Sequence, residues 1–288
     1  MVYIELGGLK VPADLHVHTR ASDGSLTPEQ VVLRAVALGL RAIAITDHDT
    51  VMGVARALRS GRKWGLHVIP GVELSTEAGG EEFHILGYFI NYRHSKLRHT
   101  LAQLRRARFV RIKKMTRRIN ELGLRVSWPR VLEIAGRGAV GRPHLARAMV
   151  EGGYISSVDE AFTRYIGSGR PAYVPRLKYT PIQAIKLIQA LGGVPVLAHP
   201  GWIREEVVIR LAAAGLRGLE VYYPQHNART SRRLYRLAQR HNLLITGGSD
   251  FHGDNRRGIE LGSAFVTSEY VTALKEASPS WSMRRKGL

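Results

Sequence analysis

The sequence predicts an α/β fold, an irregular seven-stranded (β/α) barrel with an inserted small helical subdomain. Apolar, often β-branched runs recur along the chain with helical patterns between them, as in parallel sheets buried on both faces. The strand rhythm stops between His84 and His199, where the pattern becomes helical. A chain of 288 residues has room for one large core plus such an insertion.

Seven apolar runs are expected to form the strands of the barrel. They cover Ala13–Thr19, Arg41–Thr46, His67–Leu74, Glu82–Ile90, Val194–His199, Gly218–Tyr223 and Leu243–Gly248.

Helices are expected between these strands. Two helices begin at Thr27-Pro28-Glu29-Gln30 and Thr180-Pro181-Ile182-Gln183. Each signature places Thr at the N-cap, Pro at the first helical position and Gln at the third. Further helices near Arg204–Ala214 and Ala228–His241 complete βα units around the last three strands, an order typical of a barrel.

Residues 95–175 are predicted to form the inserted helical, substrate-binding subdomain, and residues 1–94 and 176–288 to form the barrel. Residues 93–125 hold twelve Lys/Arg and one acid, Glu121. A single helix face is expected to carry Leu97, Leu101, Leu104, Ile112, Met115 and Ile119. The basic residues are interpreted either as a track for RNA phosphates or as a solvated helix face.

Composition restricts the partners and the metal chemistry. Lys+Arg outnumber Asp+Glu by 43 to 23, a formal charge of +20, which favours nucleotides, RNA or phosphorylated metabolites as partners. Without cysteine, a metal must be held by His, Asp and Glu. No run of about 18 apolar residues is present, and Met1–Pro12 lack a basic segment followed by an apolar stretch. We therefore expect a cytoplasmic protein with no membrane partner, and no obligate protein partner is evident.

Histidines beside the strand-like runs point to a metal site. Imidazole nitrogens and carboxylate oxygens are the ligand set for Zn, Mn or Fe. His16 and His18 lie two residues apart and would face the same side of a strand, although a hydrogen-bonded pair of histidines is the alternative. Similar clusters follow other predicted strands, and the carboxyl ends of barrel strands converge on one face. The pattern predicts a metal-dependent hydrolase.

Eight ordered motifs resemble the PHP (polymerase and histidinol phosphatase) domain family. They read DLHVHTRASDG, TDHDT, GVELST, HILGYF, GRPHLARAMVE, AHPG, EVYYP and GSDFHG, over about residues 13–270. The resemblance is greatest to the branch of nucleoside 3',5'-bisphosphate phosphatases that includes the 5'-to-3' exoribonuclease ribonuclease AM.

The resemblance implies a centre of three divalent ions per chain, with Mn²⁺ as the expected metal and Fe²⁺ or Zn²⁺ as alternatives. The implied ligands are His16, His18, Glu73 and Asp250 for the first ion, Glu73, His84 and His199 for the second, and Asp23, His48 and His252 for the third. The resemblance also implies that the histidinol phosphatase branch has histidine at the position where this chain has Asp23. Asp23 therefore favours the nucleotide branch.

The implied reaction is hydrolysis of the 3'-phosphate of nucleoside 3',5'-bisphosphates such as pAp. The same site is expected to trim short 5'-phosphorylated RNA in the 5'-to-3' direction. Three divalent ions against three carboxylates leave a positive surplus, which suits attack of a metal-bound hydroxide on a phosphate monoester. Two alternatives stay open: a histidinol phosphatase, and a non-catalytic nucleic-acid-binding module.

Candidates for the other roles are fewer and come with structural alternatives. Asp47, Asp49 and His226 are candidates for the general acid, and of these we retain Asp47 and His226, although Asp47 and Asp49 can instead orient His48 or cap a helix. Arg142 and His144 are expected to bind the second phosphate, and Pro143 also marks a helix start. Arg176 and Lys178 are further phosphate contacts or part of a solvated loop.

Overall fold

Seven strands form the central sheet of the computed structural model, which describes residues 5–6, 9–10, 12–136, 138–175, 179–253 and 258–279. The strands follow the chain in space from β3 to β9. Their bounds are β3 Ala13–Val17, β4 Ala42–Ile45, β5 His67–Ala78, β6 Glu81–Tyr88, β7 Val194–Leu197, β8 Gly218–Tyr222 and β9 Leu244–Gly247. A separate antiparallel pair is made by β1 Glu5–Leu6 and β2 Leu9–Lys10. All seven predicted strands are confirmed, to within a few residues at their ends.

The sheet is not parallel throughout, because β6 runs antiparallel to both of its neighbours. The cause is local: β5 and β6 are joined by a hairpin at Gly79 and Gly80, whose φ angles of +61° and +80° suit glycine. As a result, His84 lies near the beginning of its strand and still reaches the face on which the other strands end.

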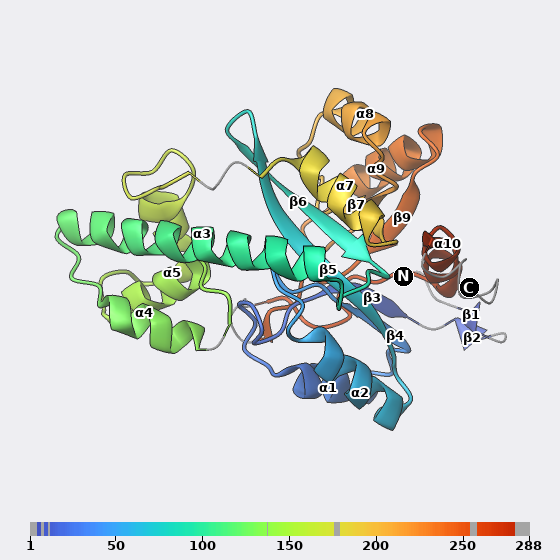
Figure 1. The fold of residues 1–288 in the computed structure, drawn as a ribbon, viewed down its shortest axis with the longest axis horizontal. Coiled ribbons are helices and arrows are strands. Elements are labelled where there is room, and N and C mark those ends of the chain that lie inside the picture. The colour runs from blue at the N-terminus through green and yellow to red at the C-terminus, as the bar shows by residue number, and fades with distance from the viewer. Residues whose placement is uncertain are drawn as a thin grey trace.

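Helices cover the outside of the sheet (Figure 1). Their bounds are α1 Pro28–Ala37, α2 Val54–Trp64, α7 Pro181–Ala190, α8 Glu205–Ala213, α9 Ala228–Arg240 and α10 Ser268–Glu276. Thr27 and Thr180 cap α1 and α7 through the predicted capping boxes. The first and last strands approach each other through the bridge between Val17 and Phe251, so the sheet curls toward a barrel.

Between β6 and α7 the chain forms a helical segment that extends to one side of the sheet (Figure 1). It contains α3 Ser95–Glu121, α4 Trp128–Ala135, α5 Arg142–Glu151, α6 Val158–Ala161 and the π-helix η1 Phe162–Ile166. The long helix α3 belongs to two cores. Leu97, Leu101 and Leu104 pack with the sheet and α7, whereas Ile112 and later residues pack with α4 and α5.

The predicted buried face of α3 is confirmed, since the six apolar residues that were assigned to that face are all buried. Within the described ranges, no helix has both the length and the apolar character needed to cross a lipid bilayer.

Candidate metal centre

The carboxyl ends of several strands bring histidines and carboxylates into one buried cluster. His16 lies in β3 and His18 directly follows it. His48 pairs with Glu73 across a β-bridge, so the loop after β4 lies against β5. His84 comes from β6, His199 follows β7, and Asp250 and His252 follow β9. Asp23 comes from the loop after β3.

Glu73 lies at the centre of this cluster, because its two carboxylate oxygens face five histidines. Oε2 is 3.3 Å from His16 Nε2, 3.2 Å from His18 Nε2 and 2.9 Å from His48 Nδ1. Oε1 is 2.7 Å from His84 Nδ1 and 3.4 Å from His199 Nε2. The side chain is fully buried, so this one carboxylate connects the two halves of the site.

Three overlapping groups have donor atoms that all lie within 4.8 Å of one another. They are His16/His18/Glu73/Asp250, His18/Asp23/His48/His252 and His48/Glu73/His84. The first group coincides with the first predicted ligand set, and the second contains the third predicted set plus His18. The remaining group has His48 where the prediction has His199, whose ring centroid lies 5.2 Å from that of His84. All nine predicted ligands thus share one site.

Their donor atoms fit divalent metal ions. Among the residues that the structure describes, His16 Nε2, both ring nitrogens of His18 and both carboxylate oxygens of Glu73 are buried and lack a hydrogen bond of good geometry. Buried polar atoms of this kind are uncommon in proteins and call for a partner. The donors are nitrogen and oxygen only, a set suited to Mn, Fe or Zn. Cations placed between them would satisfy the cluster.

The electrostatics of the cluster also demand positive charge. Burial alone would lower the pKa of His18, but the carboxylates of Glu73 and Asp250 beside its Nε2 outweigh burial and raise the pKa to about 10. Burial opposes ionisation of Glu73 as well, yet the surrounding histidines hold its pKa well below the usual range. The raised pKa of His18 and the lowered pKa of Glu73 both indicate that the cluster favours positive charge.

One expected result is that the chelated protein loses stability as pH rises from about 6.5 to about 10. The pKa of His18 is higher in the folded protein than its ordinary 6.5, so its stabilising contribution is complete below 6.5 and disappears through about 10. His48, whose pKa burial lowers to about 4, titrates below this window. Urea unfolding with chelator at several pH values measures the loss, and saturating metal should reduce it because ions replace the protons. A chelated protein with unchanged stability across this range would contradict the electrostatic account.

Comparisons with known proteins agree with this geometry. A family model described as PHP domain matches residues 14–125. The 5'-3' exoribonuclease Rnm of Salmonella typhimurium is 38% identical over 248 residues, which are 83% of this chain and 84% of that protein. The chain belongs to the PHP family. The 3',5'-nucleoside bisphosphate phosphatase of Chromobacterium violaceum is 31% identical, over 86% of this chain and 90% of that protein.

The architecture of this PHP protein is also that of solved structures. The crystal structure of a predicted metal-dependent phosphoesterase from Bifidobacterium adolescentis superimposes with a TM-score of 0.87 and 31% identity. The match covers 92% of this chain and 96% of that one. The helical segment between β6 and α7 is therefore included in the similarity, since it is too long to fall in the unmatched part.

A buried carboxylate, which opens the EVYYP motif but was given no role in the sequence analysis, orients two of the histidines of the PHP site. Glu220 Oε1 accepts a hydrogen bond at 3.0 Å from His16 Nδ1, and its Oε2 accepts at 2.7 Å from the backbone N–H of His199. This fixes the tautomer of His16 and turns Nε2 toward Glu73 and Asp250. The available signal was a charged residue inside an otherwise apolar strand, β8.

We expect Glu220→Gln to weaken Mn²⁺ binding about 10–100-fold, because the amide cannot hold His16 in the same tautomer as strongly. Titration of the chelated protein with Mn²⁺ measures the change. Glu269→Gln makes the same chemical change at an exposed position of α10 and should leave the affinity unaltered. Equal affinities for the two variants would show that Glu220 does not orient the site.

An arginine from the inserted segment also reaches the PHP site. Arg108 is buried in α3, and its guanidinium donates to Asp49 Oδ2, at 3.1 Å from Nε, and to Ser75 Oγ at 2.9 Å. Ser75 Oγ lies 3.5 Å from His48 Nδ1. Arg108 was expected to belong to a solvated helix face or an RNA track, and that expectation is wrong for this residue because it pairs with the loop that carries His48.

The two candidates for the general acid lie in different surroundings. Asp47 is fully buried and accepts hydrogen bonds from Thr19 N at 2.7 Å, Thr19 Oγ1 at 2.8 Å and Ser22 Oγ at 2.8 Å. These bonds hold the loop that carries Asp23. His226 is partly exposed, and its Nδ1 donates to the carbonyl of Val221 at 3.0 Å. The contacts of Asp47 are those of a residue that positions a loop, whereas the contact of His226 with Val221 engages only Nδ1.

The predicted substrate contacts are only partly described. Arg142 Nη2 lies 2.6 Å from Glu82 Oε2, and its guanidinium packs over the ring of Phe162. His144 is buried in the first turn of α5, where its Nδ1 accepts from the backbone N–H of Gly141 at 2.9 Å. Arg176 and Lys178 lie outside the described residues. Binding of phosphate by these four residues remains a prediction.

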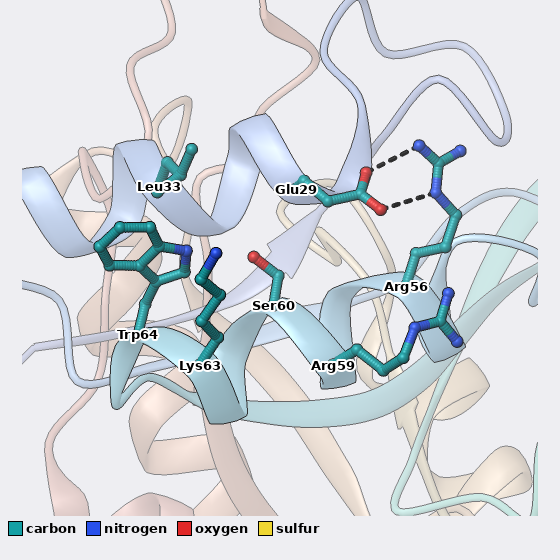
Figure 2. Close-up of a pocket in the computed structure, with 7 residues that line it drawn as sticks. All are labelled: Glu29, Leu33, Arg56, Arg59, Ser60, Lys63 and Trp64. Atoms are coloured by element: carbon teal, nitrogen blue, oxygen red, sulfur yellow. Dashed lines mark hydrogen bonds and ion pairs between the residues drawn. The ribbon is translucent and has the colours of Figure 1, made fainter.

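A surface hollow between α1 and α2 is separate from the metal centre (Figure 2). Its lining combines Trp64 with Arg59 and Lys63, while Arg56 is held by Glu29 through two hydrogen bonds of 2.8 Å. None of the nine candidate metal ligands lines this hollow. It is therefore a surface feature of the helical layer.

Proposed function

We propose that this PHP protein is a metal-dependent phosphoesterase that hydrolyses the 3'-phosphate of nucleoside 3',5'-bisphosphates and trims 5'-phosphorylated RNA from its 5' end. One observation carries the proposal: three groups of His, Asp and Glu overlap in one buried cluster, and two of them share the carboxylate of Glu73. The two named relatives, a 5'-3' exoribonuclease and a 3',5'-nucleoside bisphosphate phosphatase, support it. Both reactions break an ester bond at a 3' oxygen beside a 5'-phosphate, so one site can serve both.

The nine clustered side chains would hold three divalent ions, with Mn²⁺ as the proposed metal. Divalent ions bound there would neutralise the phosphate ester and lower the pKa of the attacking water toward about 7. Glu220 orients His16 and positions His199 through its backbone N–H, and Asp47 holds the loop of Asp23. We propose His226 rather than Asp47 as the general acid, because Asp47 is enclosed by its hydrogen bonds. His226 would act as the imidazolium, with Nδ1–H held by the carbonyl of Val221 and the proton on Nε2 given to the departing 3' oxygen. Burial lowers the pKa of His226, so this protonated form is favoured at lower pH.

We propose that residues 95–175 form the substrate-binding subdomain and supply Arg142 and His144 to the second phosphate. Arg142 is mostly buried beside Glu82, so a substrate phosphate would have to compete for the guanidinium or share it. Arg176 and Lys178 are proposed as further contacts. A cytoplasmic location also stays a prediction.

A substrate panel tests the proposal directly. Protein prepared with chelator and reloaded with Mn²⁺, Fe²⁺ or Zn²⁺ is assayed on pAp, on a 5'-phosphorylated RNA and on histidinol phosphate. We expect hydrolysis of the first two, fastest with Mn²⁺, and release of 5'-mononucleotides from the RNA. Metal analysis should return about three ions per chain, the number of overlapping groups.

Two outcomes would overturn the proposal. Faster release of phosphate from histidinol phosphate than from pAp would favour the other phosphatase branch. Absence of hydrolysis with every metal, together with RNA binding that survives His16→Ala and Asp250→Ala, would indicate a nucleic-acid-binding module.

A further inference from the structure

One face of α3 combines exposed cations with exposed apolar side chains. Arg106, Phe109, Val110, Lys113 and Arg117 recur at helical spacing and define what we term the Phe109 face. All five are exposed, Phe109 at 41% and Val110 at 45% of their surface. Large apolar residues in such positions, surrounded by cations, are typical of interaction sites.

Aromatic rings are interleaved with these cations. The ring of Phe109 meets the ring of Trp128 edge to face, with centroids 5.2 Å apart and planes at 79°. Lys113, Arg117 and Trp128 line one surface hollow that continues along α3. An exposed aromatic ring beside flexible cations is an arrangement that binds single-stranded nucleic acid without reading its sequence.

The charges of the Phe109 face are largely uncompensated. Arg106 and Lys113 form no ion pair within the part of the chain that the structure describes. Arg117 pairs with Glu121, the one acid among residues 93–125, and both side chains are exposed. Such a surface pair contributes little and exchanges readily with another anion. The face is therefore complementary to a polyanion.

The same helix connects this face to the metal centre. Arg108 directly precedes Phe109, points inward and contacts Asp49, which follows His48. From Arg106 to Arg117, α3 extends about 16 Å at 1.5 Å per residue. A strand whose 5' end lies at the metal centre can continue along this length for a few nucleotides.

We propose that the Phe109 face binds the body of the single-stranded RNA whose 5' end is hydrolysed at the metal centre. The backbone phosphates contact Arg106, Lys113 and Arg117, and a base stacks on Phe109. This inference rests on the proposed function and extends it. It implies that the substrate bound by the inserted segment is a polymer. A mononucleotide such as pAp, bound at the metal centre, is expected not to contact the face.

The test compares one long and one short substrate. Arg106→Glu/Lys113→Glu should raise KM for a 5'-phosphorylated RNA of about twelve nucleotides roughly tenfold, while kcat/KM for pAp stays within about twofold. The slope of log RNA affinity against log salt concentration should also become shallower by about 1.4, because two phosphate contacts are lost. Phe109→Leu should raise KM for the RNA about fivefold or more, and Phe109→Tyr should not, since tyrosine keeps the ring.

The hollow between α1 and α2 supplies a matched control, because it also places cations beside a tryptophan (Figure 2). Arg59→Glu/Lys63→Glu makes the same change in net charge and should leave RNA hydrolysis unaltered. The proposal is overturned if the control variant weakens RNA binding as much as the Phe109-face variant does. It is also overturned if the Phe109-face variant slows the hydrolysis of pAp and of RNA equally. If wild-type protein hydrolyses neither substrate, the proposed function itself has failed. Retained pAp hydrolysis with unchanged KM for RNA in both variants rejects this face alone.

Discussion

Replacing Glu73 by glutamine is expected to lower kcat/KM for pAp by at least about a thousandfold, or ~4 kcal/mol in transition-state stabilisation. Glutamine keeps the shape of the side chain but removes the negative charge. Five histidines lie within 3.4 Å of the two oxygens of Glu73, so no other carboxylate in the described cluster contacts as many of them. Loss of this charge weakens every group of ligands to which Glu73 belongs.

Metal analysis and steady-state kinetics on the same preparation test this result. Glu73→Gln should retain fewer ions than the wild type as well as lose activity. Glu81→Gln, at the exposed beginning of β6, serves as the control and should retain both ions and activity. A Glu73→Gln protein that binds its full number of metal ions and remains active would contradict the argument that the carboxylate of Glu73 is shared between groups of metal ligands.

The strands and the cluster of histidines could be predicted because their signals are local. Each strand is an apolar run, and each candidate ligand lies within or just after such a run. The direction of β6 was missed although a signal was present, since Gly79-Gly80 between two apolar runs is typical of a hairpin. The general expectation of a parallel sheet outweighed that local pattern.

The groups that orient the cluster could not be predicted in the same way. Glu220 acts on His16 across 204 positions of sequence, and Arg108 acts on Asp49 across 59. A sequence signal for Arg108 was present but was not used: Arg108 lies four residues after Leu104 and four before Ile112, on the predicted apolar face of the helix. The helical phase separates it from exposed neighbours such as Arg106: Arg108 shares the buried face with Ile112 and Met115. Only the packing of α3 shows that the partner of Arg108 is Asp49, beside the metal centre.

The pairing of Arg108 with Asp49 leads to a second prediction of large effect. Arg108→Met is expected to lower the free energy of unfolding by about 3–5 kcal/mol, because Asp49 keeps a buried charge without its partner. Activity at permissive temperature should fall as well, since Asp49 and Ser75 hold the loop that carries His48. Urea unfolding and pAp kinetics measure the two effects.

A matched control and a double-mutant cycle separate this pairing from general damage to α3. Arg106→Met lies one half-turn away, is exposed, and should change stability by less than about 0.5 kcal/mol. Asp49 has a φ of +51°, a conformation that asparagine also adopts, so Asp49→Asn removes the charge without straining the backbone. The double variant Arg108→Met/Asp49→Asn should be more stable than the sum of the single effects predicts, because the unpaired charge is gone. Additive effects would mean that Arg108 stabilises the fold only through packing, and that the inserted helix exerts no electrostatic hold on the loop of His48.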